Sequence, residues 1–476
     1  MKSSVSNQPD AREIVGDVVA RARAAQSAAD RWTQAQADEA AVAAGWAIVE
    51  PERNRALAET AVRDTGLGNV ADKIAKNRRK TIGLLRDLHG AKSVGVISED
   101  RTRGLIEIAR PVGVVAAITP STNPGATPAN NILNALKGRN AIILAPSPKG
   151  QSTLALLLDY MHAELERVGA PRNLVQRLAA PTSRGETHAL MRQADLVVAT
   201  GSQSNVRAAY ESGTPAIGVG AGNVTAIVDE TADLAAAAAK IARSKTFDNA
   251  TSCSSENAVI AVAAVYDALV AAFAREGGVL LDGAEARRLE TAMFADGKLA
   301  SALIAQPAAR IASMIGLERP EARAAKFLVV PESGVGSDHP FSGEKLSPVL
   351  ALYCADDFAA AAALAARILR YQGAGHSIGL HTRASQRALE LGLTLPVCRV
   401  IVNQVHCFAT GGSFDNALPF SLSMGCGTWG RNSISDNLNY WHFLNITRVV
   451  HPLRPEDVHE PTDAELFGDY RAKHRV

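Results

Sequence analysis

The chain has 476 residues, 47% hydrophobic and 21% charged, which is the ordinary balance of a globular protein with two or three domains. Its 50 Lys and Arg residues nearly cancel its 48 Asp and Glu residues, and the formal net charge of +2 does not predict a nucleic-acid partner. The first ten residues lack an apolar core and no apolar run is long enough to span a bilayer, so we expect neither a signal peptide nor a membrane partner.

The five cysteines are an odd number at irregular spacing, which favours free thiols in the reducing cytoplasm over a disulfide framework. Several lie near histidines late in the chain, and a zinc site is the alternative interpretation. The residues concerned are His376, His381, Cys398, His406, Cys407 and Cys426. None has the C-x-x-C or H-x-x-x-H spacing of a structural zinc site, so we predict no metal.

Three helices are predicted in the first hundred residues, over 11–34, 38–50 and 53–65. These segments are rich in Ala, Glu and Arg and place apolar residues at helical spacing. A strand is expected over 105–110, where Pro111 ends it. We expect these helices to be solvated packing elements that carry no chemistry.

From Val112 onward, short apolar runs alternate with helical segments. Strands are predicted over 112–119, 140–145, 174–178 and 196–200, each followed by a polar loop and a helix. Repeated strand, loop and helix at this period predict a mostly parallel, doubly wound α/β sheet. Such sheets bind nucleotides beyond the carboxyl ends of their strands, where these loops lie.

Two of these loops are candidates for phosphate contact, although the sequence has no G-x-G-x-x-G fingerprint. Gly201 and Ser202 precede a helix whose amino end can offer N–H groups to a pyrophosphate. The glycine loop over 218–223, which contains Gly220, lets a ligand approach the backbone closely. Ordinary turn chemistry explains either loop equally well, so neither decides the function alone.

A lone cysteine, Cys253, stands in a polar loop over 247–257. An amphipathic helical run precedes this loop and an apolar strand follows it. A thiol is well suited to attack a carbonyl group near neutral pH, because part of it is already thiolate. The alternative is that Cys253 is a small buried filler, as most free cysteines are.

The rest of the chain again alternates between helices and strands. Helices are predicted over 263–275 and 283–296, and strands over 299–305 and 326–330. The segment 403–433 is different, because it is glycine-rich and polar with aromatic residues interleaved. Loops of this length inside a compact domain are usually functional.

Several segments together resemble a known family. ITPSTNP at 118–124, FDNATSCSSE at 247–256 and EKLSPVL at 344–350 resemble the aldehyde dehydrogenase superfamily. GVGAGN at 218–223 and MGCGTWGRNSISDN at 424–437 are similar to its CoA-acylating branch. These motifs occur in the family's order, which makes the resemblance specific.

The resemblance implies a fold and an assembly. It implies a Rossmann-type cofactor domain over 1–230, with an inserted α/β catalytic domain over 231–408. A C-terminal segment over 409–476 is expected to return to the cofactor domain or to an oligomer interface. The family also implies a homodimer or homotetramer.

The resemblance also implies catalytic roles. Cys253 attacks the aldehyde carbon, and Asn123 stabilises the oxyanion together with the backbone N–H of Cys253. A nicotinamide accepts the hydride, and Glu344 holds its ribose. The residues expected to bind NAD or NADP are Thr119, Pro120, Ser121, Gly201, Ser202, Gly220, Glu344, Lys149 and Arg184. The alternatives are that Asn123 is a turn residue and Glu344 a solvated loop charge.

Two departures from the family pattern bear on the reaction. Hydrolysing members carry a glutamate base where this chain has Val219, so the thioester on the catalytic cysteine is expected to wait for the thiol of coenzyme A. They also carry Lys and Glu where this chain has Ala145 and Pro148. Without that carboxylate we expect NADP+ to be preferred, with Lys149 and Arg184 near the 2′-phosphate unless both are solvated cations.

Arg431 indicates the class of aldehyde, because acetaldehyde-acting relatives have glycine at this position. A guanidinium holds a carboxylate or sulfonate by two parallel hydrogen bonds. The alternative is that Arg431 is a surface residue that forms an ion pair with Asp436 or Asp415. We therefore expect sulfoacetaldehyde first and succinate semialdehyde second, with Ser254 as another substrate contact. Acetaldehyde as the substrate, a hydrolytic aldehyde dehydrogenase and a non-catalytic relative that binds only a nucleotide are less favoured by these residues.

Overall fold

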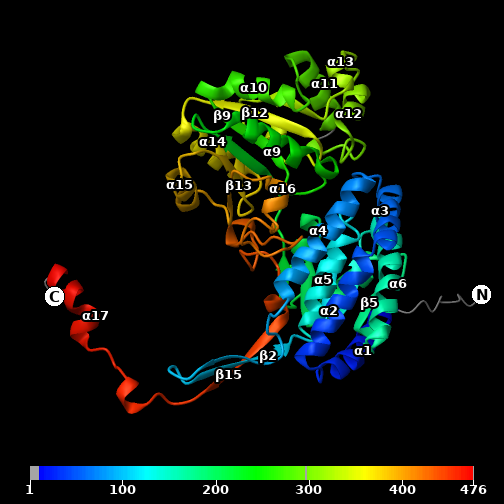
Figure 1. Cartoon of the computed structure of the whole chain (residues 1–476), viewed down its shortest axis with the longest axis vertical. Coiled ribbons are helices and arrows are strands. Elements are labelled where there is room, and N and C mark those ends of the chain that lie inside the picture. The colour runs from blue at the N-terminus through cyan, green and yellow to red at the C-terminus, as the bar shows by residue number, and fades with distance from the viewer. Residues whose placement is uncertain (1–9, 295–296, 475–476) are drawn as a thin grey trace, which may run out of the picture.

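The computed structural model describes residues 10–294 and 297–474, which form two lobes and an extended arm (Figure 1). The N-terminal lobe is built on a five-stranded sheet, the second lobe on a seven-stranded sheet and the arm on a three-stranded sheet. Within these ranges, no helix is both long and apolar enough to cross a membrane.

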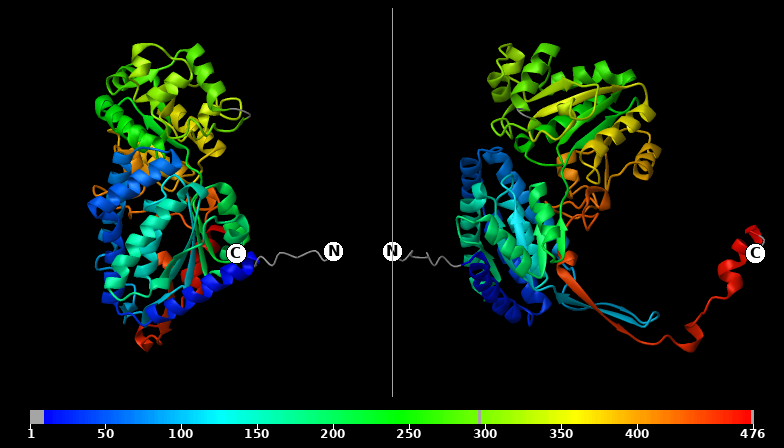
Figure 2. Two further views of the ribbon diagram at one scale, coloured as in Figure 1. Left: turned by 90° about the vertical axis from the view of Figure 1, so that its right-hand side faces the viewer. Right: turned by 180° about the vertical axis from the view of Figure 1, so that it is seen from behind.

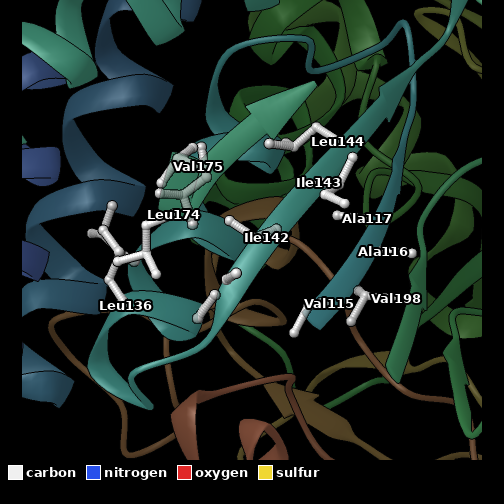
Figure 3. Close-up of a cluster of buried hydrophobic side chains, with 14 of the residues drawn as sticks. Val115, Ala116, Ala117, Leu136, Ile142, Ile143, Leu144, Leu174, Val175 and Val198 are labelled. Atoms are coloured by element: carbon white, nitrogen blue, oxygen red, sulfur yellow. The ribbon is translucent and has the colours of Figure 1, made fainter. Parts of the chain in front are cut away.

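The N-terminal lobe contains five parallel strands in the order β5-β4-β3-β6-β7. Their bounds are β3 Val114–Thr119, β4 Ala141–Pro146, β5 Val175–Arg177, β6 Leu196–Ala199 and β7 Ala216–Gly218. All residues of β3, β4 and β6 are buried, as expected for a parallel sheet with both faces covered. Figure 3 shows Val115, Ile142 and Leu136 in this buried cluster. The predicted doubly wound sheet is confirmed.

The helices of this lobe pack around that sheet (Figure 1). They are α1 Ala11–Ala29, α2 Gln34–Val49, α3 Pro51–Thr65, α4 Val70–Leu88, α5 Ala126–Lys137, α6 Gln151–Arg167, α7 Arg184–Gln193 and α8 Gln203–Glu211. The helix predicted over 11–34 ends earlier, because Thr33 begins α2 as its N-cap and accepts a hydrogen bond from the N–H of Gln36. Helix α4 was not predicted, and it proves to matter most for the site.

The second lobe contains seven parallel strands in the order β10-β11-β12-β9-β8-β13-β14. Their bounds are β8 Val224–Val228, β9 Glu256–Val262, β10 Gly278–Leu280, β11 Phe327–Pro331, β12 Val349–Ala355, β13 Ile378–His381 and β14 Val400–Val402. Strand β8 belongs to this sheet, so the chain passes between the two sheets after Gly218, earlier than the predicted domain boundary at residue 230.

Helices cover this second sheet as well (Figure 1). They are α9 Leu234–Thr246, α10 Tyr266–Arg275, α11 Gly283–Met293, α12 Ala308–Met314, α13 Pro320–Arg323, α14 Phe358–Tyr371, α15 Gln386–Thr394 and the short α16 His406–Ala409. The strand predicted over 299–305 is wrong, because this segment forms turns. The helix predicted over 283–296 ends at Met293, and its last two predicted residues lie outside the described ranges.

The arm joins segments from opposite ends of the chain. Strands β1 Gly95–Asp100, β2 Leu105–Pro111 and β15 Leu444–Val450 form an antiparallel sheet in the order β1-β2-β15. Beyond β15 the chain runs on to α17 Asp463–His474, which lies far from both lobes (Figure 2). No described residue of α17 is buried, so this end of the chain packs against neither lobe.

Candidate active site

A cavity of about 580 Å³ opens where the two lobes meet. One side is formed by the loops that follow β3, β4, β6 and β7, which all lie at the carboxyl edge of the five-stranded sheet. The other side is formed by the loop between α9 and β9 and by the C-terminal segment 407–424. The expectation that ligands bind at this edge of the sheet fits the position of the cavity.

The loop that carries Cys253 has a strained backbone. Three successive residues, Asp248, Asn249 and Ala250, adopt positive φ angles of 51°, 51° and 59°. None of them is glycine, and each such residue costs on the order of 1 kcal/mol unless its surroundings hold it in place. This turn ends α9 and directs Cys253, which is partly buried, into the cavity before β9 begins.

The buried carboxylate of Asp248 holds this loop. It accepts hydrogen bonds from the Asn69 backbone N–H at 3.0 Å, from Lys73 Nζ at 3.1 Å, from Lys76 Nζ at 2.6 Å and from Thr251 Oγ1 at 2.7 Å. Burial opposes ionisation of Asp248, but the two lysines outweigh it and hold its pKa below the ordinary value. The carboxylate is therefore charged, and it ties α4 of one lobe to the cysteine loop of the other.

Lys76 also orients the predicted oxyanion donor. Its Nζ donates to Asn123 Oδ1 at 2.9 Å, and an ammonium group can only donate, so this amide atom is the oxygen. The amide N–H2 group of Asn123 forms no hydrogen bond with the part of the chain that the structure describes, and Asn123 lines the cavity. A donor in that place suits the negative oxygen of an attacked aldehyde.

The α4 lysines correct an expectation from the sequence. The N-terminal helices were expected to carry no chemistry, whereas Lys73 and Lys76 support the cysteine loop and Lys80 lines the cavity itself. The signal was present in the spacing, because residues 73, 76 and 80 share one face of a helix. A row of like charges on one helix face needs counter-charges from elsewhere in the fold.

The thiol of Cys253 is protonated near neutral pH. Burial raises its pKa to about 12, and the negative charges of Glu344 and Cys426 act in the same direction, while Lys76 opposes them. Little thiolate is therefore present at Cys253 near neutral pH in the free protein. The nucleophile must lose its proton as the reaction begins.

Several buried polar atoms on the cavity wall have no hydrogen-bond partner within the described residues. They are Thr119 Oγ1, Thr127 Oγ1, Ser147 Oγ, Glu344 Oε1 and His376 Nε2. Unpaired buried groups are costly, which indicates a polar ligand with hydroxyl groups and other polar atoms. Burial raises the pKa of Glu344 to about 8, against the opposing effects of Lys245 and Lys345. These groups fit the ribose and amide of a nicotinamide nucleotide.

Two glycines bring the backbone close to two different segments, the loop of Cys253 and the segment of Cys426. A Cβ atom on Gly222 would lie 2.2 Å from the carbonyl oxygen of Cys253, and one on Gly220 would lie 2.8 Å from Cys426 Sγ. Both glycines line the cavity beside Val219. Glycine is required here because no side chain fits between these segments.

Most of the predicted site residues lie together on the cavity wall. They are Cys253, Ser254, Asn123, Thr119, Pro120, Ser121, Gly201, Ser202, Gly220 and Glu344. The three predicted cations do not, because Lys149, Arg184 and Arg431 are exposed and do not line it. Arg431 belongs to a surface turn with a φ of 57°, so the structure does not support its predicted contact with the substrate.

His376 is a cavity residue that the sequence suggested only as a metal ligand. Its Nδ1 lies 2.8 Å from Ser377 Oγ, and its unpaired Nε2 is on the cavity side. Burial lowers its pKa to about 3, and Arg399 and His406 act in the same direction. The imidazole is therefore neutral in the cavity.

Comparison with known proteins agrees with this geometry. The model of the aldehyde dehydrogenase family matches residues 6–285. The sulfoacetaldehyde dehydrogenase (acylating) of Cupriavidus necator is 63% identical over 463 residues, which are 97% of this chain and 93% of that protein. The crystal structure of an acetylating aldehyde dehydrogenase from Geobacillus thermoglucosidasius has a TM-score of 0.90 at 35% identity, covering 95% of this chain and 98% of that one.

Two further similar structures contain ligands, both with a TM-score of 0.83 at 25% identity over 92% of this chain. One is an engineered glycolyl-CoA reductase with bound NADP+, of which 96% is covered. The other is the propionaldehyde dehydrogenase of Rhodopseudomonas palustris with bound propionyl-CoA, of which 94% is covered. One protein of this fold thus binds NADP+ and another binds a CoA thioester.

The raised pKa of Cys253 predicts how the thiol reacts with iodoacetamide. Only the thiolate reacts, so the rate at Cys253 should rise about tenfold for each pH unit from pH 7 to pH 9, without a plateau. Mass spectrometry of the Cys253 peptide measures this rate, and the exposed Cys354 in the same digest reports on the reagent. A plateau below pH 9 at Cys253 would contradict the raised pKa.

Replacing Asp248 by Asn should destabilise the protein. The change leaves Lys73 and Lys76 buried without their counter-charge, and breaking such a pair costs about 3–5 kcal/mol. Denaturation by urea measures the free energy of unfolding. The control is Glu99→Gln, which removes an exposed ion pair with Arg101 and should change stability little. Equal effects of the two variants would contradict the role of Asp248.

Proposed function

The chain belongs to the aldehyde dehydrogenase family as a CoA-acylating member, and we propose that its substrate is sulfoacetaldehyde. In the proposed reaction, sulfoacetaldehyde, coenzyme A and NAD(P)+ give sulfoacetyl-CoA, NAD(P)H and a proton. The similarity to the sulfoacetaldehyde dehydrogenase (acylating) of Cupriavidus necator over nearly the whole chain supports this substrate. The arrangement of Cys253 and Asn123 in one cavity supports the chemistry.

Cys253 begins the reaction. As the thiol proton passes to water, Sγ forms a bond to the aldehyde carbon, and the carbonyl electron pair moves onto the oxygen. The resulting oxyanion accepts hydrogen bonds from the Asn123 amide, which Lys76 holds in orientation, and from the backbone N–H of Cys253. These donors stabilise the charge as it develops.

Oxidation then leaves an acyl group on Cys253. A nicotinamide nucleotide, when bound, accepts the hydride from the carbon that Cys253 has attacked. The residues that would hold it are those with unpaired polar atoms on the cavity wall, above all Glu344 and Thr119. The oxygen keeps its contact with Asn123 as the carbonyl forms again.

Val219 supports transfer to a thiol over hydrolysis. This apolar side chain lines the cavity near Cys253, and Glu344 is the one carboxylate among the described residues of the lining. Burial raises the pKa of Glu344 to about 8, so near neutral pH only a minor fraction of it is the carboxylate that could activate water. The thiolate of coenzyme A attacks the acyl carbon instead, and Cys253 leaves as a thiolate.

Product analysis tests the proposal. With sulfoacetaldehyde and NAD(P)+, absorbance at 340 nm should rise only when coenzyme A is present, and mass spectrometry should find the acyl thioester. Cys253→Ala should lose turnover, whereas Cys354→Ala, at an exposed position outside the cavity, should keep it. Steady release of free carboxylate without coenzyme A would overturn the acylating mechanism.

The same assay decides the nucleotide, for which we propose NADP+. Ala145 and Pro148 provide no carboxylate that would repel a 2′-phosphate. Lys149, which follows Pro148, is exposed and free to turn toward such a phosphate. A clear preference for NAD+ in kcat/KM would rule this out. A cytoplasmic location, expected from the unpaired cysteines, stays a prediction.

We also propose that the arm joins copies of this chain into a dimer or tetramer. Val450 at the end of β15 is 72% exposed, and Leu466, Phe467 and Tyr470 of α17 are exposed as well. An edge strand and a helix with exposed apolar residues favour association with another surface. Light scattering should show an oligomer that Val450→Asp weakens, while Glu460→Gln on the same segment should not. A monomeric parent protein would contradict the proposal.

A further inference from the structure

Lys80 of α4 is a buried cation without a carboxylate partner. Its side chain is 6% exposed, and it lines the same cavity as Cys253. Its Nζ donates to the backbone carbonyls of Gly411 at 2.6 Å and of Gly412 at 3.5 Å. Within the described residues it forms no ion pair, so its positive charge is not balanced by the protein. A buried ammonium in this state favours an anionic ligand.

The two neighbouring lysines of α4 show the contrast. Lys73 and Lys76 are equally buried, but both form ion pairs with Asp248. Asp248 thereby forms an ion pair with two lysines of this helix face, and it forms none with the third lysine, Lys80. Lys80 lies one helical turn beyond Lys76, on the face that meets the cavity.

The backbone around Lys80 leaves room for its ammonium group. A Cβ atom on Gly411 would lie 2.5 Å from the backbone oxygen of Ser421 and 2.7 Å from Lys80 Nζ, and the fixed backbone oxygen makes glycine necessary at this position. Lys80 Nζ lies 5.5 Å from the centre of the Phe420 ring, which is buried and does not line the cavity. The lining of the cavity itself includes the small polar side chains of Thr127 and Ser421, which suit a short anion.

We propose that the Lys80 ammonium binds the anionic end of the aldehyde and thereby selects sulfoacetaldehyde over uncharged aldehydes. This inference rests on the proposed function. It assigns to Lys80 the role that the sequence suggested for Arg431, which the structure places outside the cavity. In this arrangement the sulfonate meets Lys80 while the aldehyde carbon meets Cys253.

Arg79, which precedes Lys80 in α4, is a second candidate cation, but it is bound elsewhere. Arg79 donates from Nη2 to Ser413 Oγ at 2.5 Å and stacks on Phe408 and Phe414. It lines a separate cavity of about 360 Å³ that also contains Asp415. Arg243 lines that second cavity as well, but Cys253 does not, so Lys80 is the cation that shares a cavity with the nucleophile.

The charge of Lys80 depends on pH near neutrality. Burial lowers its pKa to about 7, and the neighbouring Arg79 and Lys76 act in the same direction, while Cys407 and Cys253 oppose them. The ammonium is present below this pKa and is lost as the pH rises above it. Binding of an anion should therefore weaken from pH 6 to pH 9.

The test compares two aldehydes in Lys80→Met, which keeps an unbranched side chain only one atom shorter and removes its charge. The ratio of kcat/KM for sulfoacetaldehyde to kcat/KM for acetaldehyde should fall by at least about tenfold, as expected for the loss of one charge-assisted hydrogen bond. The ratio in the parent protein should also fall from pH 6 to pH 9, and in Lys80→Met it should stay flat. Because the Cys253 thiol reacts with both aldehydes, its titration cancels in the ratio.

Arg431→Met is the matched control and should leave the ratio unchanged. If Arg431→Met lowers the ratio and Lys80→Met does not, the inference is wrong. Equal losses on both aldehydes in Lys80→Met also overturn it, because they indicate that Lys80 only supports the backbone at Gly411. The proposed function fails separately, if the parent protein does not oxidise sulfoacetaldehyde in the presence of coenzyme A.

Discussion

The buried carboxylate of Asp248 is the interaction on which the rest of the site depends. It is contributed by the loop that precedes the nucleophile, and it binds Lys73 and Lys76 from a helix of the other lobe. Its hydrogen bonds hold a turn of three left-handed residues that would not be stable alone. Because Lys76 also contacts Asn123, a single ion cluster positions both the nucleophile and the oxyanion donor. The two lobes therefore form the site only when they are docked.

The ion cluster also determines the electrostatic character of the cavity. Asp248 forms ion pairs with two of the three buried lysines of α4, and the third, Lys80, lines the cavity without such a pair among the described residues. The acidic group in the lining, Glu344, raises the pKa of Cys253 and has a raised pKa of its own. The nucleophile thus lies in a cavity with a cation and a carboxyl group on its wall. Such a cavity is poised to bind an anionic aldehyde together with a polar nucleotide.

The sequence predicts those parts of the structure that depend on local pattern. Strands such as β3 and β4 are buried on both faces, so their continuous apolar runs are enough to identify them. Cys253 and Asn123 stand in distinctive motifs, and both lie on the cavity wall. The lysines of α4 could not be identified in this way, because charged residues on a helix are usually solvated. Their burial depends on an aspartate more than 170 positions away along the chain.

The same physics explains why a lysine and an exposed arginine are not equivalent as anion sites. An arginine at the surface, such as Arg431, interacts through water, where a charge pair contributes little and salt screens it. Lys80 is already desolvated. Its ammonium group has three N–H donors, and the backbone carbonyls of Gly411 and Gly412 accept hydrogen bonds from it at 2.6 Å and 3.5 Å, so its capacity to donate is satisfied only in part. A sulfonate removes that deficit, whereas an uncharged aldehyde leaves it in place. When an uncharged analogue binds, a buried cation stays unpaired, which costs much more free energy than it does for an exposed cation that water solvates. Burial of the cation is therefore itself a source of specificity.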